Sequence, residues 1–326
     1  MILSKTPLRM SFVGGGSDMP SFYREHGGAV ISSAINAFVY VVVKKKFDEG
    51  VRLSYSRTEN VIHARDLEHP IVRNILQLTN YQDPIEIISI ADIPSSGTGL
   101  GSSSSFTVGL LRAINALQSK ELDKRDLAES ACHVEIDLCG SPIGKQDQYA
   151  AAFGGLKLYE FNADDSVGVK EMKVTSNTST ILNSEILSFY IGGARSANKI
   201  LADQEKQLKN KNKIKSMKRM VELAYDLKNE LENGSIENFG EILHENWILK
   251  KGMTKDIANE HIDDIYKIAM NSGAIGGKLL GAGGGGFMIF HVPSADNRNK
   301  LIKKLNNLRQ VHFKLYNKGS EIIDII

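Results

Sequence analysis

The fold is decided by one stretch, Pro94-Ser-Ser-Gly-Thr-Gly-Leu-Gly-Ser-Ser-Ser-Ser105. Branched apolar residues alternate over residues 85–90, as in a strand, and apolar residues recur at helical spacing over residues 106–117. The order is therefore strand, glycine-rich turn, helix. Glycine adopts backbone angles closed to other residues, so the turn can fold its amide groups into a concave nest at a helix start, where the helix dipole also favours an anion. The stretch predicts a site for a polyphosphate.

Two common phosphate-binding patterns do not fit this stretch. A dinucleotide-binding fingerprint requires a third glycine where Ser102 stands, and a P-loop requires Gly-Lys-Ser/Thr after a four-residue spacer. Neither is present. Taken alone, the stretch could also be a glycine-rich turn with ordinary capping serines.

The composition is that of a globular protein. The 326 residues are 42% hydrophobic and 24% charged, enough for one large or two ordinary domains. A net charge of +2 does not produce the overall positive potential that would favour binding of nucleic acid. No leader and no apolar run of ~18 residues is found, so we expect a cytoplasmic protein without a membrane partner.

We expect Cys132 and Cys139 to be reduced thiols. Nothing in the sequence indicates an oligomeric state.

A second glycine cluster, Gly14-Gly-Gly-Ser-Asp18, follows an extended segment over residues 2–13. Consecutive glycines suit the close approach of a backbone to another group. The carboxylate of Asp18 can accept hydrogen bonds from hydroxyl groups. Alternatively, Asp18 caps the helix expected from Pro20 onward.

Two carboxylates lie between the glycine clusters. A helix expected over residues 122–138, capped by Asp123, carries Glu135 near its end, and a short helix of small residues begins near Asp147. Asp147 could act as a general base, or as an electrostatic anchor, for a hydroxyl that attacks phosphorus, while Glu135 holds Mg²⁺. Asp147 could equally be a helix cap, and spacing alone does not decide between these roles.

The second half of the chain alternates helices and strands. We expect strands over residues 186–192, 274–280, 287–292 and 311–315, and we expect the glycine turn 281–286 to lie against the Pro94–Ser105 stretch. Arg195 follows Gly192-Gly193 at a helix start, where its guanidinium would suit a second phosphate or would cap neighbouring carbonyls. The basic run over residues 206–219 is a solvated face or a flap over that phosphate.

These motifs resemble those of the GHMP kinase superfamily of small-molecule kinases. Three match in order: Thr6 through Asp18, Pro94 through Ser105, and Lys278-Leu-Leu-Gly-Ala-Gly-Gly-Gly-Gly-Phe287; the Gly144–Gln148 segment lies between them. The resemblance implies an α+β GHMP kinase fold. It implies two α+β domains, residues 1–177 and a ferredoxin-like domain of residues 178–326, with the active site in the cleft between them.

The resemblance also implies ATP and Mg²⁺ as cofactors and assigns roles residue by residue. Asp147 faces the acceptor hydroxyl and is supported by Arg9, while Ser103 and Glu135 bind Mg²⁺. The residues expected to bind the ATP phosphates are Ser96, Gly97, Gly99, Leu100, Gly101, Ser102, Ser103 and Ser104. Those expected to bind the substrate are Gly15, Gly16, Ser17, Asp18, Asp147 and Arg195. The adenine pocket is expected in the region of residues 55–73.

Within the superfamily, the segments around the first glycine cluster, Glu68–Arg73 and Gly144–Gln148 resemble the bacterial D-glycero-D-manno-heptose 7-phosphate kinases. That resemblance implies a sugar phosphate substrate and phosphorylation of its anomeric hydroxyl to a 1,7-bisphosphate. Galactokinases carry Glu-His where Gly15-Gly16 stands, which disfavours galactose. The alternatives are a fucokinase-like anomeric sugar kinase and a non-catalytic sensor of sugar and nucleotide.

Overall fold

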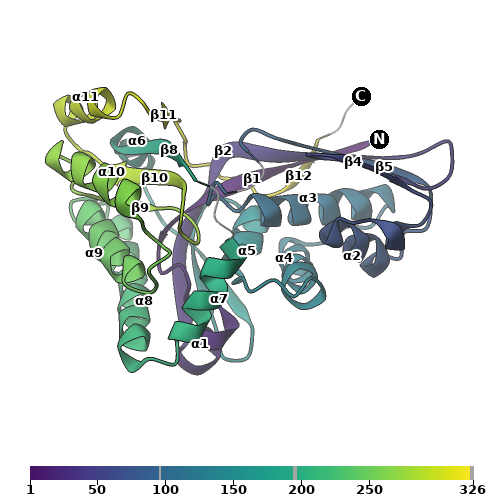
Figure 1. Ribbon diagram of the computed structural model, residues 1–326, viewed down its shortest axis with the longest axis horizontal. Helices are drawn as coiled ribbons and strands as arrows, with labels where there is room; N and C mark the ends of the chain where they lie inside the picture. The colour runs from purple at the N-terminus through teal and green to yellow at the C-terminus, as the bar shows by residue number, and fades with distance from the viewer. Residues whose placement is uncertain (95–96, 194–196, 324–326) are drawn as a thin grey trace.

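The computed structural model describes residues 1–94, 97–193 and 197–323. In this part of the chain the strands form two sheets, each accompanied by helices (Figure 1). The expectation of an α+β fold is confirmed. Among the described residues, no helix combines the length and the apolar character that crossing a membrane requires.

The first sheet contains eight of the described strands, in the order β12-β1-β2-β5-β3-β4, with β6 and β7 added beside β2. Every pairing is antiparallel except that of β3 with β5. The strands are β1 (Ile2–Val13), β2 (Gly28–Lys45), β3 (Val51–Ser54), β4 (Thr58–Val61), β5 (Ile85–Ala91), β6 (Leu156–Phe161), β7 (Val167–Glu171) and β12 (Glu321–Ile323).

Helices α2, α3 and α4 lie along one face of this sheet (Figure 1). Helix α3 contacts both β1 and β2, and its residues Val108, Leu110 and Ile114 are fully buried in the larger hydrophobic core. The helices of this half are α1 (Pro20–His26), α2 (Pro70–Leu78), α3 (Ser102–Leu117), α4 (Lys124–Cys132) and α5 (Gln146–Phe153), with a 3-10 turn at Ala64–Asp66. The core thus holds the amino end of α3 at a fixed place beside β1.

The second sheet has the order β11-β8-β10-β9, which is the 4-1-3-2 order of a ferredoxin-like βαββαβ unit. Its strands are β8 (Ile186–Gly192), β9 (Gly276–Leu279), β10 (Gly286–His291) and β11 (Arg309–Gln310). Its helices are α6 (Ser176–Glu185), α7 (Ala197–Gln207), α8 (Lys211–Glu232), α9 (Phe239–Lys251), α10 (Glu260–Asn271) and α11 (Ala295–Lys304). A second hydrophobic core, with Trp247, Phe189 and Phe290 among its buried members, lies here.

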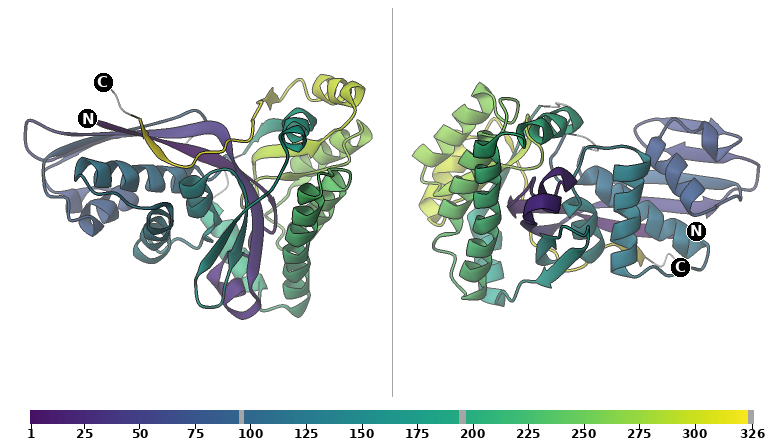
Figure 2. Two further views of the ribbon diagram at one scale, coloured as in Figure 1. Left: turned by 180° about the vertical axis from the view of Figure 1, so that it is seen from behind. Right: turned by 90° about the horizontal axis from the view of Figure 1, so that it is seen from below.

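The two halves are interlinked. Helix α8 packs against β1 and β2, and the last described strand, β12, pairs with β1. Figure 2 shows the carboxy-terminal segment running back along the first sheet toward the amino terminus. The domain division between residues 177 and 178 stays a prediction. The final described strand, β12, belongs to the second half of the chain but lies in the sheet of the first half.

Two local expectations need correction. Residues 311–315 do not form the expected continuous strand, because β11 ends at Gln310. The segment makes only isolated backbone contacts with two strands: Asn36 N in β2 donates to Lys314 O at 3.0 Å, and Val311 N donates to Ser188 O in β8 at 3.0 Å. The helix expected over residues 122–138 begins as predicted, since Asp123 caps it through the amides of Arg125 and Asp126. Its last part, His133–Leu138, is π-helical. Segments of this kind are frequent at functional sites, and this one carries Glu135.

Candidate active site

The predicted order of strand, glycine turn and helix is present: β5 ends at Ala91, and the described part of the stretch, residues 97–105, forms the turn and the start of α3. Gly97, Gly99 and Gly101 have φ values of +72°, +75° and +76°, which only glycine adopts at little cost. Helix α3 begins at Ser102. The turn therefore presents backbone amides next to a helix amino end, the arrangement that favours anions.

The second glycine turn lies against this loop, as expected. Phe287 N donates to Thr98 O at 3.1 Å, and a Cβ placed on Gly99 would lie 2.2 Å from the carbonyl oxygen of Leu280. No side chain fits at that distance. The turn after β9 thus supports the loop from the carboxy-terminal half, which places the loop where the two halves meet.

Arg9 and Asp147 form a bidentate ion pair beside the loop. Arg9 Nε and Nη2 each donate to one carboxylate oxygen of Asp147 at 2.7 Å, and Arg9 Nη1 donates to the carbonyl of Gly99. The register of β1 against β2 shifts between Pro7 and Arg9, with the extra residues in β2, and such irregularities are frequent next to active sites. The carboxylate lies against the loop, because a Cβ on Gly101 would meet Asp147 Oδ2 at 3.2 Å.

Ser103 and Glu135 meet on the wall of the same site. Ser103 Oγ donates to Glu135 Oε1 at 2.7 Å, and Gln148 Nε2 donates to Glu135 Oε2 at 2.7 Å. Burial raises the pKa of Glu135 above its ordinary value, although hydrogen bonds from Ser103, Ser104 and Gln148 oppose the shift. Two adjacent oxygen donors suit Mg²⁺, which keeps several water and phosphate ligands. Within the described residues, no cluster of three His, Cys, Asp or Glu offers a complete protein cage.

Asp18 is buried and turned toward the loop before α5. It accepts hydrogen bonds from Gly16 N at 2.8 Å and Gln146 N at 3.2 Å. Burial, together with the charge of Asp147, raises the pKa of Asp18. The cap position of α1 is held by Met19 without a side-chain bond, so the alternative role for Asp18 as helix cap is wrong. A Cβ on Gly144 would lie 1.9 Å from Asp18 Oδ2, which explains the glycine there.

These groups surround a single cavity of about 540 Å³. Most residues that the sequence singled out line it: Arg9, Gly15, Gly16, Asp18, Gly97, Gly99, Gly101, Ser102, Ser103, Ser104, Glu135 and Asp147. Two do not. Leu100 is fully buried and its carbonyl accepts the amide of Arg9, while the hydroxyl of Ser17 bonds to the backbone of Ala29. Ser96 and Arg195 lie outside the described residues.

Two lysines in this cavity were not anticipated from the sequence. Lys250 Nζ donates to Gly15 O at 3.1 Å and to Gln204 Oε1 at 2.7 Å, and Lys278 Nζ donates to the carbonyls of Ser11 at 2.7 Å and Phe12 at 2.9 Å. Burial lowers the pKa of Lys250 to about 8 and that of Lys278 well below its ordinary value. Only Lys250 could have been found from the sequence: helical spacing puts it on the apolar face of α9, where a lysine is unusual.

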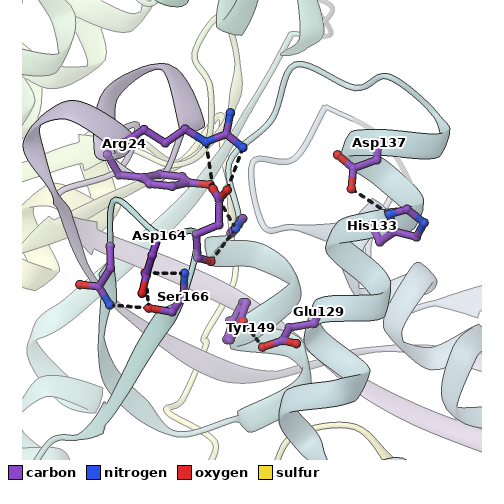
Figure 3. Close-up of polar contacts among 11 residues, drawn as sticks. Arg24, Glu129, His133, Asp137, Tyr149, Asp164 and Ser166 are labelled. Atoms are coloured by element: carbon purple, nitrogen blue, oxygen red, sulfur yellow. Dashed lines mark hydrogen bonds and ion pairs between the residues drawn. The ribbon is translucent and has the colours of Figure 1, made fainter.

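The first turn of α5, which carries Asp147, is held from outside the cavity. Lys145 Nζ donates to the carbonyl of Asp165 at 2.8 Å, and the Asp165 carboxylate accepts from Tyr23 Oη at 2.7 Å and from Arg24 (Figure 3). The hydrogen bond from Arg24 is the main cause that lowers the pKa of Asp165 to about 2. This network ties the start of α5 to α1 and to the hairpin between β6 and β7.

Two further regions were singled out from the sequence: the basic run over residues 206–219 and the expected adenine pocket over residues 55–73. No residue of the basic run 206–219 is among the described residues that line the cavity. In the region expected to shape an adenine pocket, the ring of His69 lies 4.9 Å from that of Tyr55 and 5.4 Å from that of Phe106 in α3. This aromatic group adjoins the helix that follows the loop, and its role in binding adenine stays a prediction.

Comparison with known proteins identifies relatives over the whole chain. The model for the GHMP kinases N terminal domain matches residues 64–155, and that for the GHMP kinases C terminal domain matches residues 216–309. The chain is 28% identical over 316 residues to a D-glycero-alpha-D-manno-heptose 7-phosphate kinase of Campylobacter jejuni, covering 93% of each chain.

Two further relatives place the chain among similar proteins. It is 24% identical over 336 residues to a bifunctional fucokinase/GDP-fucose pyrophosphorylase of Arabidopsis thaliana, of which it covers 32%. A crystal structure of a D-glycero-D-manno-heptose 1-phosphate kinase from Bacteroides thetaiotaomicron superposes with a TM-score of 0.82 and 25% identity, and all of each chain is covered.

Proposed function

Since the chain belongs to the GHMP kinase family of small-molecule kinases, we propose that it transfers the γ-phosphoryl group of ATP to the anomeric hydroxyl of D-glycero-D-manno-heptose 7-phosphate. One observation carries the proposal: the Arg9–Asp147 pair lies against the glycine loop in the cavity that also contains Asp18. The choice of a phosphorylated heptose is supported by the Campylobacter jejuni relative, which is similar over 93% of both chains.

In this proposal the ATP phosphates bind the amides of the nest formed by Gly97, Gly99 and Gly101. Ser103 and Glu135 would hold Mg²⁺, which when bound neutralises phosphate charge. Phosphoryl transfer requires mainly positioning and charge stabilisation from the protein. The fixed donors around the loop therefore supply most of what the chemistry needs.

Asp147 orients the acceptor hydroxyl and takes its proton as the oxygen bonds to the γ-phosphorus atom and the bond to ADP breaks. An anomeric hydroxyl is more acidic than an ordinary alcohol, so a carboxylate suffices as base. Arg9 fixes that carboxylate with two hydrogen bonds and adds a positive charge beside the transferring group.

A sugar as acceptor is supported by polar groups that the protein leaves free in this cavity. Ser11 Oγ and Gln146 Oε1 are buried without a hydrogen-bond partner among the described residues, and both side chains line the cavity. Buried polar atoms normally have partners. Sugar hydroxyls can supply them here, together with the carboxylate of Asp18.

The fucokinase relative supports a second candidate, a kinase for an unphosphorylated sugar. A non-catalytic sensor is less well supported, because it has no need for Arg9, Glu135 and Asp147 together in one arranged site. The two kinase candidates differ in the charge of the substrate, which an assay resolves directly.

The test is ADP release with Mg-ATP across a panel of acceptors: D-glycero-D-manno-heptose 7-phosphate, sedoheptulose 7-phosphate, mannose, galactose and L-fucose. The proposal predicts turnover with the manno-heptose phosphate and little with the others. Preferred turnover of L-fucose would replace it by the fucokinase-like candidate, and silence across the panel would favour the sensor.

A further inference from the structure

Helix α9 contacts the first glycine cluster through two side chains spaced four residues apart, and such residues share one helix face. Asn246 Oδ1 accepts from Gly14 N at 3.1 Å, and Lys250 Nζ donates to Gly15 O at 3.1 Å. The approach is close, because a Cβ on Gly16 would lie 3.0 Å from Lys250 Nζ. The helix therefore carries an ammonium group into the corner of the cavity formed by this loop.

Lys250 has an unusual set of contacts for a buried cation. Its side chain belongs to a residue that is 7% exposed, yet no carboxylate of the described residues forms an ion pair with it; its two acceptors, Gly15 O and Gln204 Oε1, are neutral. An ammonium group has three N–H donors, so one remains. Burial of a charge without a counter-charge is costly, and proteins retain such groups where a ligand supplies that charge.

Helix α7 forms the other side of this corner. Gln204 accepts from Lys250 and donates through Nε2 to the carbonyl of Ala282 at 3.2 Å, while Asn198 and Leu201 of the same helix line the cavity. Lys250 thus lies where α9, α7 and the glycine cluster meet. The corner is distinct from the ATP loop, where Arg9 is paired with Asp147 and contacts Gly99.

The charges of the cavity also point to an anion. Arg9 is neutralised by Asp147, and Glu135 is assigned to Mg²⁺. Among the described lining residues this leaves Lys250, the carboxylate of Asp18, and Lys278, whose pKa burial and the charge of Lys250 lower well below its ordinary value. The attraction of Asp18 raises the pKa of Lys250, but burial is the larger effect. With a pKa of about 8, Lys250 is protonated at neutral pH.

We propose that Lys250 is a specificity-determining residue, whose ammonium group binds the phosphate that the acceptor sugar already carries and so selects phosphorylated acceptors over neutral sugars. The inference rests on the proposed function in that it assumes an acceptor held in this cavity. It differs from a purely structural role, in which Lys250 only supports the carbonyl of Gly15, because a structural role would affect charged and neutral acceptors alike.

The test compares Lys250→Gln with the wild type by ADP release, using D-glycero-D-manno-heptose 7-phosphate and unphosphorylated D-glycero-D-manno-heptose. Glutamine keeps a donor but removes the charge. We expect the KM ratio of neutral to phosphorylated acceptor to fall about 30-fold or more, the loss typical when one partner of a buried charged pair is removed. The KM for ATP stays unchanged.

Two further variants make the test decisive. Lys251→Gln is the matched control, because the neighbouring lysine lies outside the cavity lining and pairs with Asp263 at 2.9 Å; it keeps the wild-type ratio. Lys250→Arg retains the charge and is expected to keep most of the selectivity. If Lys250→Gln does not fold, a Lys250→Arg protein that turns over but has lost selectivity overturns the inference.

The outcomes separate this inference from the proposed function. An equal rise of KM for both acceptors in Lys250→Gln overturns the role of Lys250 while the heptose phosphate kinase stands. A wild type that prefers another phosphorylated acceptor, such as sedoheptulose 7-phosphate, with that preference lost in Lys250→Gln, supports the role of Lys250 and refutes the proposed substrate. A wild type that prefers neutral sugars overturns both.

Discussion

Replacing Asp147 by asparagine removes the proposed base while keeping its shape. Asparagine retains one oxygen acceptor for Arg9, but its NH₂ group then faces the second guanidinium N–H, so one of the two 2.7 Å contacts is lost. The remaining amide cannot take a proton at neutral pH. We therefore expect turnover to fall by ~10² or more, the usual contribution of a positioned base.

The same substitution has a calculable effect on stability. The side chain of Arg9 is 5% exposed and that of Asp147 is 23% exposed, so the guanidinium keeps its charge in a largely water-free place. Loss of one charge-assisted hydrogen bond costs roughly 1.5–3 kcal/mol. The variant is thus expected to unfold at a lower temperature but to remain folded under assay conditions. Because the glycine loop is untouched, ATP affinity is unchanged.

The assay is steady-state ADP release at saturating acceptor, with ATP affinity measured by calorimetry and folding by thermal denaturation. Asp137→Asn is the matched control, since Asp137 is exposed and pairs with His133 outside the cavity (Figure 3); its turnover should equal that of the wild type. A folded Asp147→Asn protein with wild-type turnover would refute the assignment of the base.

The other predictions concern the metal, the sugar corner and pH. Glu135→Gln removes the charged oxygen donor proposed for Mg²⁺, so the Mg²⁺ concentration for half-maximal activity should rise about tenfold or more; an unchanged requirement argues against that ligand. Gly144→Ala puts a Cβ where Asp18 Oδ2 lies, so KM for the acceptor should rise more than KM for ATP; the reverse pattern would remove Asp18 from the sugar site. The pKa of Lys250, about 8 against an ordinary 10.5, predicts that KM for the phosphorylated acceptor rises as pH increases through 8, when Lys250, facing Asp18 and near Lys278, loses its proton. The same shift makes the unfolded state bind more protons between these two values, so this group makes folding more favourable as pH rises through that window; thermal denaturation against Lys250→Gln measures it.

The sequence predicted those parts of the candidate site that depend on residue type and short spacing along the chain. Glycine clusters predict a close approach of backbones, and the structure has it where Gly99 meets Leu280 and Gly281. A carboxylate at the start of a helix of small residues marked Asp147, and the family resemblance joined it to Arg9. These signals depend on residue type and short spacing, which sequence shows directly.

Other features depend on tertiary contacts that have no local pattern. Lys278 lies in a short strand whose four residues are all buried, and its partners Ser11 and Phe12 are far away in sequence. The apolar residues of 311–315 have strand propensity, but that segment makes only isolated contacts with β8 and β2 and forms no continuous strand pairing. Ser17 was expected to bind the substrate because of the residues beside it in the glycine cluster, yet its hydroxyl bonds to the backbone N–H and C=O of Ala29. For Lys250 a signal existed: a lysine on the apolar face of α9, with Trp247 three residues before it, is unusual.

The most direct test of the central claim identifies the product. Enzyme, Mg-ATP and D-glycero-D-manno-heptose 7-phosphate are incubated, and the sugar product is examined by ³¹P NMR for a new phosphorus signal coupled to the anomeric proton. We predict such a signal beside the retained signal at carbon 7, which identifies the 1,7-bisphosphate. A new phosphate on another hydroxyl, or none with active protein, would contradict the assignment of the anomeric hydroxyl as the acceptor that Asp147 faces.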